Sequence, residues 1–342
     1  MSEETIYMLS NTPEFEDEAF EPTYRQHPAI ANSDLKYLHS PKLFQLNKQQ
    51  QLEEESNPAF YFGTFIDDYL LSEDFNEKYI LDEGIESPSS PNQKKFLDLI
   101  MTHEGDLNTA DIASYYGECY AKPNEDKALE LYNSLQPYIL FSEKSKGKTV
   151  YSEDDLDKAK NIVHNIQNHE LLNDWIFEDK VKDQARFSHL QIVDKEFWGV
   201  KWKGELDRVI VDFNTKEIYN LDLKSTSKPI SNFHYSYRNY RYYRQQALYR
   251  KLLLAHLVDA NIIEDASEWL VKTRVMIVQS VFPYEVGAAF IPNNVLVKGE
   301  QELEECAELI KYYDKNGWDR TKSYRENNYC EVYDWSEVFD NF

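Results

Sequence analysis

The pattern of apolar and polar positions predicts helices along most of the first half of the chain and strands in the second. Helical periodicity marks residues 58–71, 92–102, 108–116, 125–135, 153–168, 235–258 and 294–313. Alternating or short apolar runs, typical of strands, mark residues 182–193, 197–202, 205–212, 217–223, 271–281 and 290–291. We therefore expect an α/β protein with a mixed central β-sheet flanked by helices.

Two of these strands, 205–212 and 217–223, predict a β-hairpin because only a short polar turn separates them. Residues two apart on a strand face the same side, so Asp222 shares a face with Lys224, and Asp207 shares one with the acid two positions before it. Pairing would bring up to three carboxylates and one ammonium group together. Carboxylate oxygens are ligands for Mg²⁺, and a lysine beside a metal can hold or deprotonate water. The hairpin therefore carries the side chains needed for metal-assisted phosphodiester hydrolysis.

The length of the chain and the breaks in its pattern indicate one large domain with an insertion. A chain of 342 residues can bury a large core, and we expect a single domain over 1–342. Two prolines at 88–91 mark a break in the chain near the start of the insertion. The expected parts are a helical N-terminal part, a helical insertion, an α/β core, and a C-terminal helix with a tail, at 28–84, 85–150, 151–300 and 301–342.

Charge is distributed unevenly along this acidic chain. The formal net charge of −24 argues against nucleic-acid binding, because contact with phosphates needs local positive charge. From Leu223 to Val258, however, the sequence has no Asp or Glu, and basic residues are interleaved with tyrosines. Such a mixture suits a surface that follows phosphates and stacks on bases. The alternative is a polar helix with its tyrosines at a domain surface. The candidate DNA contacts are Arg238, Arg241, Arg244 and Tyr242.

Composition excludes several other classes of protein. Cys119, Cys306 and Cys330 are scattered, and an odd, sparse set fits a reducing cytoplasm. The acidic N-terminus lacks the regions of a signal peptide, and no apolar run reaches membrane-spanning length, so we expect no membrane partner. The sequence contains no glycine-rich nucleotide loop, no Gly-x-Ser-x-Gly elbow and no His-Glu-x-x-His motif.

The hairpin acids also carry a family resemblance. Asp207, followed by Asp222-Leu223-Lys224, resembles the signature of the PD-(D/E)xK nuclease superfamily. Gln245 and Tyr249 resemble the Gln-xxx-Tyr element of RecE-type and lambda-type phage exonucleases. Residues 30–41 are similar to their N-terminal Ser-x-Leu…Ser-Pro segment, and residues 63–71 to their Gly-xxx-His-xx-Leu-Leu helix. The resemblance covers residues 28–80 and 150–260.

The resemblance implies a restriction-endonuclease-like core and assigns roles to its residues. Asp207 and Asp222 would be metal ligands, with the backbone carbonyl of Leu223 completing the site. Lys224 would orient or deprotonate the attacking water, or stabilise charge on the phosphorane. The glutamine–tyrosine pair would lie on a helix face that approaches the active site and DNA. The alternatives are solvated strand-end acids, a plain ion pair between Lys224 and Asp222, and an ordinary helix pair.

Two positions depart from the family pattern. The family usually supplies another acid upstream of the hairpin. Gln184 fills that slot by position, with Glu178 and Glu205 as rivals. A glutamine would offer a neutral carbonyl and bind a metal more weakly. Asp67 stands where relatives often have histidine, and an aspartate can still coordinate a metal. Each of these could instead be an ordinary surface residue.

The sequence therefore predicts a Mg²⁺-dependent DNA exonuclease, with Mn²⁺ as an alternative ion, acting in phage recombination or replication. Besides DNA, the expected partners are a single-strand annealing protein and further copies of the chain. The expected location is the cytoplasm of a bacterial host cell. Two alternatives stay open. One is a degenerate nuclease fold that binds DNA without cutting it, favoured by the irregular acid and histidine positions. The other is an acidic interaction protein or DNA mimic, against which the acid-free segment argues.

Overall fold

The computed structural model of the protein describes residues 24–52, 58–120, 122, 124–178 and 181–326. The chain divides into two compact units. The first combines Met1–Ser72 with Lys158–Phe342, and the second is Glu73–Asp157. The second unit therefore begins earlier and ends later than the insertion expected at 85–150, and it is a compact body of its own.

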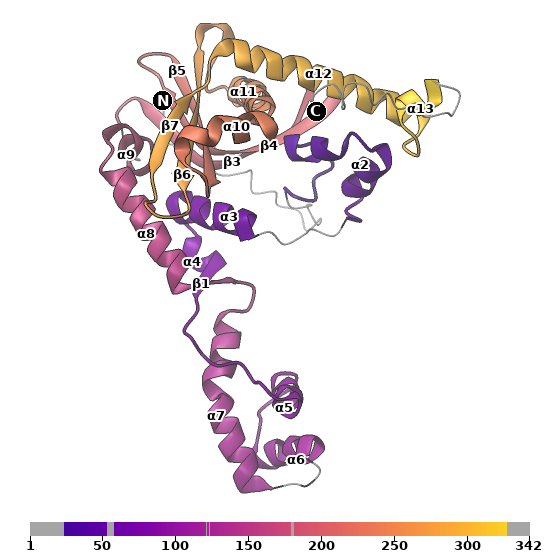
Figure 1. Ribbon diagram of the computed structural model, residues 1–342, viewed down its shortest axis with the longest axis vertical. Helices are drawn as coiled ribbons and strands as arrows, with labels where there is room; N and C mark the ends of the chain where they lie inside the picture. Colours follow the sequence, from indigo (N-terminus) through magenta and orange to yellow (C-terminus); the bar gives the residue numbers. More distant parts are fainter. Residues whose placement is uncertain (1–23, 53–57, 121, 123, 179–180, 327–342) are drawn as a thin grey trace, which may run out of the picture. The chain divides into compact units, whose positions relative to one another are not determined.

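The first unit is built on a five-stranded mixed β-sheet (Figure 1). In spatial order its strands are β3 (Gln184–Phe197), β4 (Val200–Asp212), β5 (Glu217–Thr226), β6 (Leu270–Gln279) and β7 (Val286–Phe290). Neighbouring strands are antiparallel except β5 and β6, which run parallel because a helical crossover joins them. The mixed sheet flanked by helices confirms the fold class that the sequence predicted.

Helices cover this sheet, and α12 packs along α11 (Figure 1). The helical elements that accompany the sheet are η1 (Asn32–Tyr37), α2 (Pro41–Lys48), α3 (Pro58–Leu71), α8 (Glu153–Gln167), α9 (Glu170–Phe177), η2 (Ile230–Asn232), α10 (Phe233–Asn239), α11 (Tyr242–Asp259), η3 (Ala266–Glu268), α12 (Asn293–Asn316) and α13 (Lys322–Glu326). Of these, α8 begins within the second unit. The core contains the fully buried side chains of Trp202, Leu206, Leu248, Leu252 and Leu303.

β4 is one long strand where the sequence predicted two, at 197–202 and 205–212. Gly204 interrupts the apolar alternation but is itself paired with β3. A Cβ atom at this position would lie 2.7 Å from Leu252 and 2.9 Å from Tyr249. Glycine here therefore lets α11 pack directly on the strand that carries the hairpin acids.

The helix predicted over 235–258 is two helices, α10 and α11. The chain turns at Arg241, whose φ of +53° is left-handed. Phe233 of α10 is buried with Val275 and Ile277 of β6, so α10 is held on the sheet by its own apolar contacts. A continuous polar and aromatic pattern does not show such a break. Helix α9, which follows α8 after a short turn, was not predicted from the sequence.

The second unit is a small helical body with its own core. Its elements are α4 (Phe75–Lys78), β1 (Tyr79–Leu81), α5 (Pro91–Met101), α6 (Thr109–Tyr120), α7 (Glu125–Lys144) and β2 (Thr149–Tyr151). Phe96, Ile112, Leu135 and Ile139 are buried together among α5, α6 and α7. The three helices expected in this part are present, and α7 is longer than expected because it continues through Pro137.

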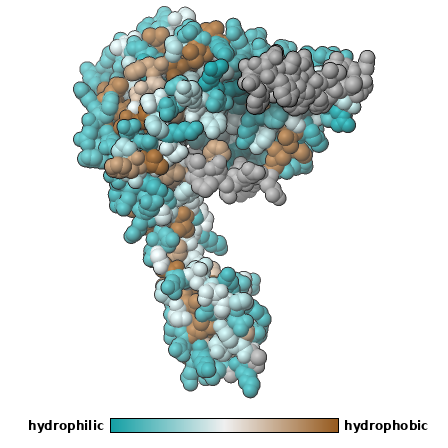
Figure 2. Space-filling model, in the orientation of Figure 1, coloured by the Kyte–Doolittle hydropathy of each residue, from teal (hydrophilic) through white to brown (hydrophobic). Residues whose placement is uncertain are grey.

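The face in Figure 2 is largely hydrophilic where the structure describes its residues, with apolar side chains in scattered patches. Within the described ranges, no helix is both long enough and apolar enough to cross a membrane. The tail expected after the last helix falls at residues 327–342, which lie outside the described residues.

Candidate active site

Asp207 and Asp222 stand opposite each other where β4 and β5 separate. The ladder between these strands ends at the pair Arg208–Leu221, and the two aspartates are the next residues on each strand. Beyond that pair, the backbone N–H of Leu223 donates to Oδ2 of Asp207 at 2.7 Å. Asp222 is 1% exposed, so its carboxylate is shielded from solvent.

Lys224 is directed at Asp222. Its Nζ lies 2.6 Å from Oδ2 of Asp222 and donates to the carbonyl oxygen of Leu223 at 3.2 Å. It also lies 5.3 Å from the centre of the Tyr242 ring. Burial opposes the positive charge, but Asp222 and Asp207 outweigh burial and raise the pKa of Lys224. Lys224 is therefore an ammonium ion at neutral pH, held between carboxylates.

Helix α3, which lies against β5, brings a third carboxylate, that of Asp67, to this cluster. Its Oδ1 atom is buried and accepts no hydrogen bond from any described residue. Burial is the main cause that raises the pKa of Asp67 to about 6, and Asp222 adds to it, while His189 and Lys224 oppose it. Asp67, Asp207, Asp222 and Lys224 thus interact electrostatically as one group.

The three buried carboxylates disfavour one another's charge. Burial, reinforced by Asp67 and Asp222, raises the pKa of Asp207 well above its ordinary range. Burial also raises the pKa of Asp222, although Lys224 and the amide of Gln246 oppose this. On one side Asp207 borders a void of about 10 Å³ lined mostly by apolar side chains, which offers little solvation. One ammonium group against three acids leaves an excess of negative charge when all are ionised.

The carboxylate oxygens of this cluster are ligands of the type that a divalent cation binds, but they are not gathered into one preformed metal site. The buried carboxylate oxygens of Asp67 and Asp222 are the kind of ligand that a hard cation takes. Across the described ranges, no three His, Cys, Asp or Glu side chains are close enough to bind one ion together. A cation at Asp222 would compete with the ammonium group of Lys224.

Gln245 and Tyr249 lie one turn apart on α11 and contact each other. Nε2 of Gln245 donates to the hydroxyl oxygen of Tyr249 at 2.7 Å. Burial, with smaller contributions from Asp222 and Asp207, raises the pKa of the Tyr249 hydroxyl well above its usual value. The pair therefore borders the acid cluster from the helix that packs on β4.

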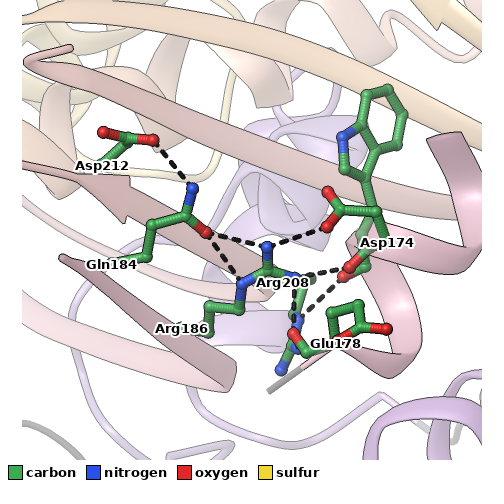
Figure 3. A network of polar contacts seen from close by, with 7 residues as sticks. Asp174, Glu178, Gln184, Arg186, Arg208 and Asp212 are labelled. Carbon is green, nitrogen blue, oxygen red and sulfur yellow. Dashed lines mark hydrogen bonds and ion pairs between the residues drawn. The ribbon is translucent and has the colours of Figure 1, made fainter. Parts of the chain in front are cut away.

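Gln184 lies outside this cluster, in a separate polar network (Figure 3). Its Nε2 donates to Asp212 at 2.7 Å, and its Oε1 accepts from Arg186. Its partner in the sheet is Asp212, the last residue of β4, so the structure places Gln184 away from the acids that it was expected to join. The rival Glu178 is exposed, and only its backbone carbonyl joins the network.

His189, to which the sequence pattern assigned no role, lies between the ladder pairs Ser188–Arg208 and Leu190–Leu206, and so falls opposite Asp207 by position. Its Nδ1 lies 3.6 Å from Oε1 of Glu205 and 3.7 Å from Oδ2 of Asp67. Glu205, the other rival for the upstream acid, therefore reaches the cluster through His189. Although burial opposes it, these carboxylates raise the pKa of His189. A lone histidine in a strand gives no sequence signal, and only the register shows its place.

Two of the arginines that the acid-free segment offered as DNA contacts are engaged within the protein. Arg244 is 6% exposed, and its Nε donates to the side-chain oxygen of Asn32 at 2.9 Å, so it is not available to DNA. Arg241 lies 3.6 Å from Glu302 of α12, and this acid offsets its charge. Arg238 is exposed, while Tyr242 faces Lys224 as described above. A sequence window cannot show acids that a later helix supplies.

A mixed sheet that presents Asp207 beside Asp222-Leu223-Lys224 on adjacent strands defines the PD-(D/E)xK nuclease superfamily. Residues 32–264 match a family model described as a PDDEXK-like domain of unknown function (DUF3799), and the chain belongs to this family. A solved structure from Eubacterium rectale, described as a "Putative exonuclease", is similar at a TM-score of 0.46 and 11% identity. The match covers 97% of this chain and 98% of the other. Comparison with curated proteins gives no match.

Proposed function

We propose that the protein is a Mg²⁺-dependent DNA nuclease that degrades duplex DNA from its ends. The observation that carries this proposal is the meeting of Asp207, Asp222 and Lys224 where β4 and β5 separate, with Asp67 beside them. Groups with strongly shifted pKa values and specific charged partners gather preferentially at functional sites. Membership of the PDDEXK-like family supports the same activity.

The residues of the chain would divide the work of phosphodiester hydrolysis. Asp207, Asp222 and the carbonyl of Leu223 would hold Mg²⁺, or Mn²⁺ in its place, with Asp67 as a further carboxylate beside them. When bound, the ion would supply positive charge to phosphate oxygens and make water more acidic. Lys224 would orient or deprotonate the attacking water, or place positive charge beside the reacting phosphate.

Action at DNA ends is the finer part of the proposal. Its support is the Gln245–Tyr249 pair, which resembles an element of phage exonucleases and whose tyrosine interacts electrostatically with Asp222 and Asp207. A hydroxyl and an amide at this place could contact the DNA strand that enters the cluster. The exposed cation of Arg238 and the ring of Tyr242 are the remaining candidates for contact with DNA.

One plasmid, linearised or kept as a closed circle, tests the activity and its dependence on ends. We expect the linear form to shorten with Mg²⁺ or Mn²⁺, the closed form to persist, and EDTA to stop the reaction. Equal cleavage of both forms would contradict dependence on ends. Binding of DNA without cleavage under either metal would favour the degenerate nuclease fold. Neither binding nor cleavage would favour an acidic interaction protein.

A further inference from the structure

We propose that His189 is a positioning residue that holds the carboxylate of Asp67 toward the acid cluster. Its backbone on β3 adopts a strained conformation to place the ring there. The inference rests on the proposed function and adds to it a residue that the hairpin motif does not contain. Its support comes from the backbone of His189, from its contacts, and from its place opposite Asp207 in the sheet.

The backbone of His189 departs from strand geometry in the middle of β3. Its φ is +49°, in the left-handed region that is unfavourable for residues other than glycine. The pairs Ser188–Arg208 and Leu190–Leu206 flank it in one unbroken register. No extra residue is therefore inserted here, and a β-bulge does not account for the conformation. Strain of this kind, left unexplained by the sheet, is characteristic of functional sites.

This conformation places the imidazole between α3 and β4. Nδ1 lies 3.7 Å from Oδ2 of Asp67 and 3.6 Å from Oε1 of Glu205, and Nε2 lies 4.0 Å from Oδ1 of Asp68. Nε2 is buried and makes no hydrogen bond with the described residues. The ring thus contacts carboxylates from two separate elements and ties α3 to the sheet.

Asp67 needs such a partner because two of the other charged groups near it repel its carboxylate. Lys224 attracts its carboxylate, but Asp68 and Asp222 both disfavour its ionised form, and Oδ1 has no donor in the described part of the chain. Without the ring of His189, repulsion would favour rotamers that turn the carboxylate out of the cluster. His189 would therefore act through Asp67 rather than by touching the reacting atoms.

Two substitutions separate the ring from the backbone strain. His189→Asn removes the ring but keeps a residue that tolerates left-handed geometry, and His189→Gly removes both the ring and the strain. We expect Mg²⁺-dependent cleavage to fall by about 10–100-fold in both, the range for loss of a group that orients a ligand. DNA affinity should stay at the wild-type level. Because both variants lack the ring, the melting temperature of His189→Gly should equal or exceed that of His189→Asn.

Asp194 supplies the matched control on the same strand. Its φ is +56°, but it lies within the register shift between Ile192 and Lys195, where a bulge accounts for its conformation. Its ion pairs are with His27 and Lys201 rather than with the acid cluster. Asp194→Gly should therefore leave cleavage at the wild-type level.

A double-mutant cycle tests whether His189 acts through Asp67. In an Asp67→Asn background, His189→Asn should lower cleavage no further. Independent multiplication of the two effects, or full cleavage by His189→Asn alone, would overturn the inference. Absence of cleavage by the wild type would defeat the proposed function first. In that case thermal unfolding still tests the strain, because a lower melting temperature for His189→Gly than for His189→Asn would refute a strained position.

Discussion

Replacing Asp67 with asparagine should stabilise the metal-free protein while lowering its rate of DNA cleavage. Partial burial is the main cause that disfavours the charge of this carboxylate, and Asp68 and Asp222 add to it, whereas an amide of nearly the same shape carries no charge. Because the folded protein raises the pKa of Asp67, it holds this proton more tightly than the unfolded chain does. Ionisation therefore costs stability as pH rises. The cost is absent well below pH 3.8, grows between 3.8 and about 6, and is complete above that range.

The size of the effect follows from the shift. The pKa rises from 3.8 to about 6, and one pH unit corresponds to about 1.4 kcal/mol. Ionised Asp67 should therefore cost on the order of 3 kcal/mol at neutral pH. The side chain is 22% exposed, so solvent screening reduces this figure only modestly. At about 2 °C per kcal/mol for a large domain, the melting temperature should rise by about 6 °C.

Urea and thermal unfolding in EDTA, at neutral pH and near pH 4, measure this gain. We expect Asp67→Asn to be more stable than the wild type at neutral pH and close to it in acid. Asp212→Asn is the control. Although burial opposes it, hydrogen bonds from Thr215, Gln184 and Asn214 lower the pKa of Asp212, so this change should destabilise the protein at neutral pH and matter less in acid. A gain for Asp67→Asn that is absent at neutral pH, or equal at both pH values, would refute the reasoning.

Three further outcomes follow from other parts of the molecule. Lys224→Ala should lower the rate of single-turnover cleavage by about 10²–10⁴-fold with little loss of DNA affinity, and Lys224→Arg should not restore the rate, because a guanidinium keeps its proton and differs in shape. Full cleavage by the alanine variant would make the Asp-x-Lys match coincidental. Charge reversal at the exposed residues Lys228 and Arg238 should weaken DNA binding and make its salt dependence shallower by about two phosphate contacts; an unchanged slope would place DNA elsewhere. Gly204→Ala should destabilise the protein by about 1–3 kcal/mol in urea, because its Cβ atom would lie 2.7 Å from Leu252; wild-type stability would contradict the close packing of α11 on β4.

The central part of the site could be predicted because it is local in sequence. Asp207, Asp222 and Lys224 belong to one hairpin whose turn and alternation are visible in the chain, and strand periodicity alone brings the acids together. The mixed sheet follows for a similar reason, since a helix must connect the parallel strands β5 and β6. Short-range patterns thus carried the fold class and the hairpin acids.

The remainder depended on contacts between distant segments, which periodicity does not encode. Counting along the chain suggested Gln184 for the upstream slot, whereas the β3–β4 register puts His189 opposite Asp207. The acid-free segment suggested a DNA surface, yet Glu302 of α12 approaches Arg241, and Arg244 turns inward. In each case the partner comes from another strand or helix, so the register and packing decide where the side chain lies.

Cleavage of an end-labelled linear duplex by Asp222→Asn, compared with the wild type under saturating Mg²⁺, tests the central claim most directly. The substitution keeps the shape of a side chain that is 1% exposed but removes the charge that pairs with Lys224 and would hold the metal. We expect the wild type to cut and the variant to show no measurable cleavage, while binding DNA as tightly and unfolding at no lower temperature. Cleavage by Asp222→Asn at the wild-type rate would contradict the assignment of this cluster as the active site.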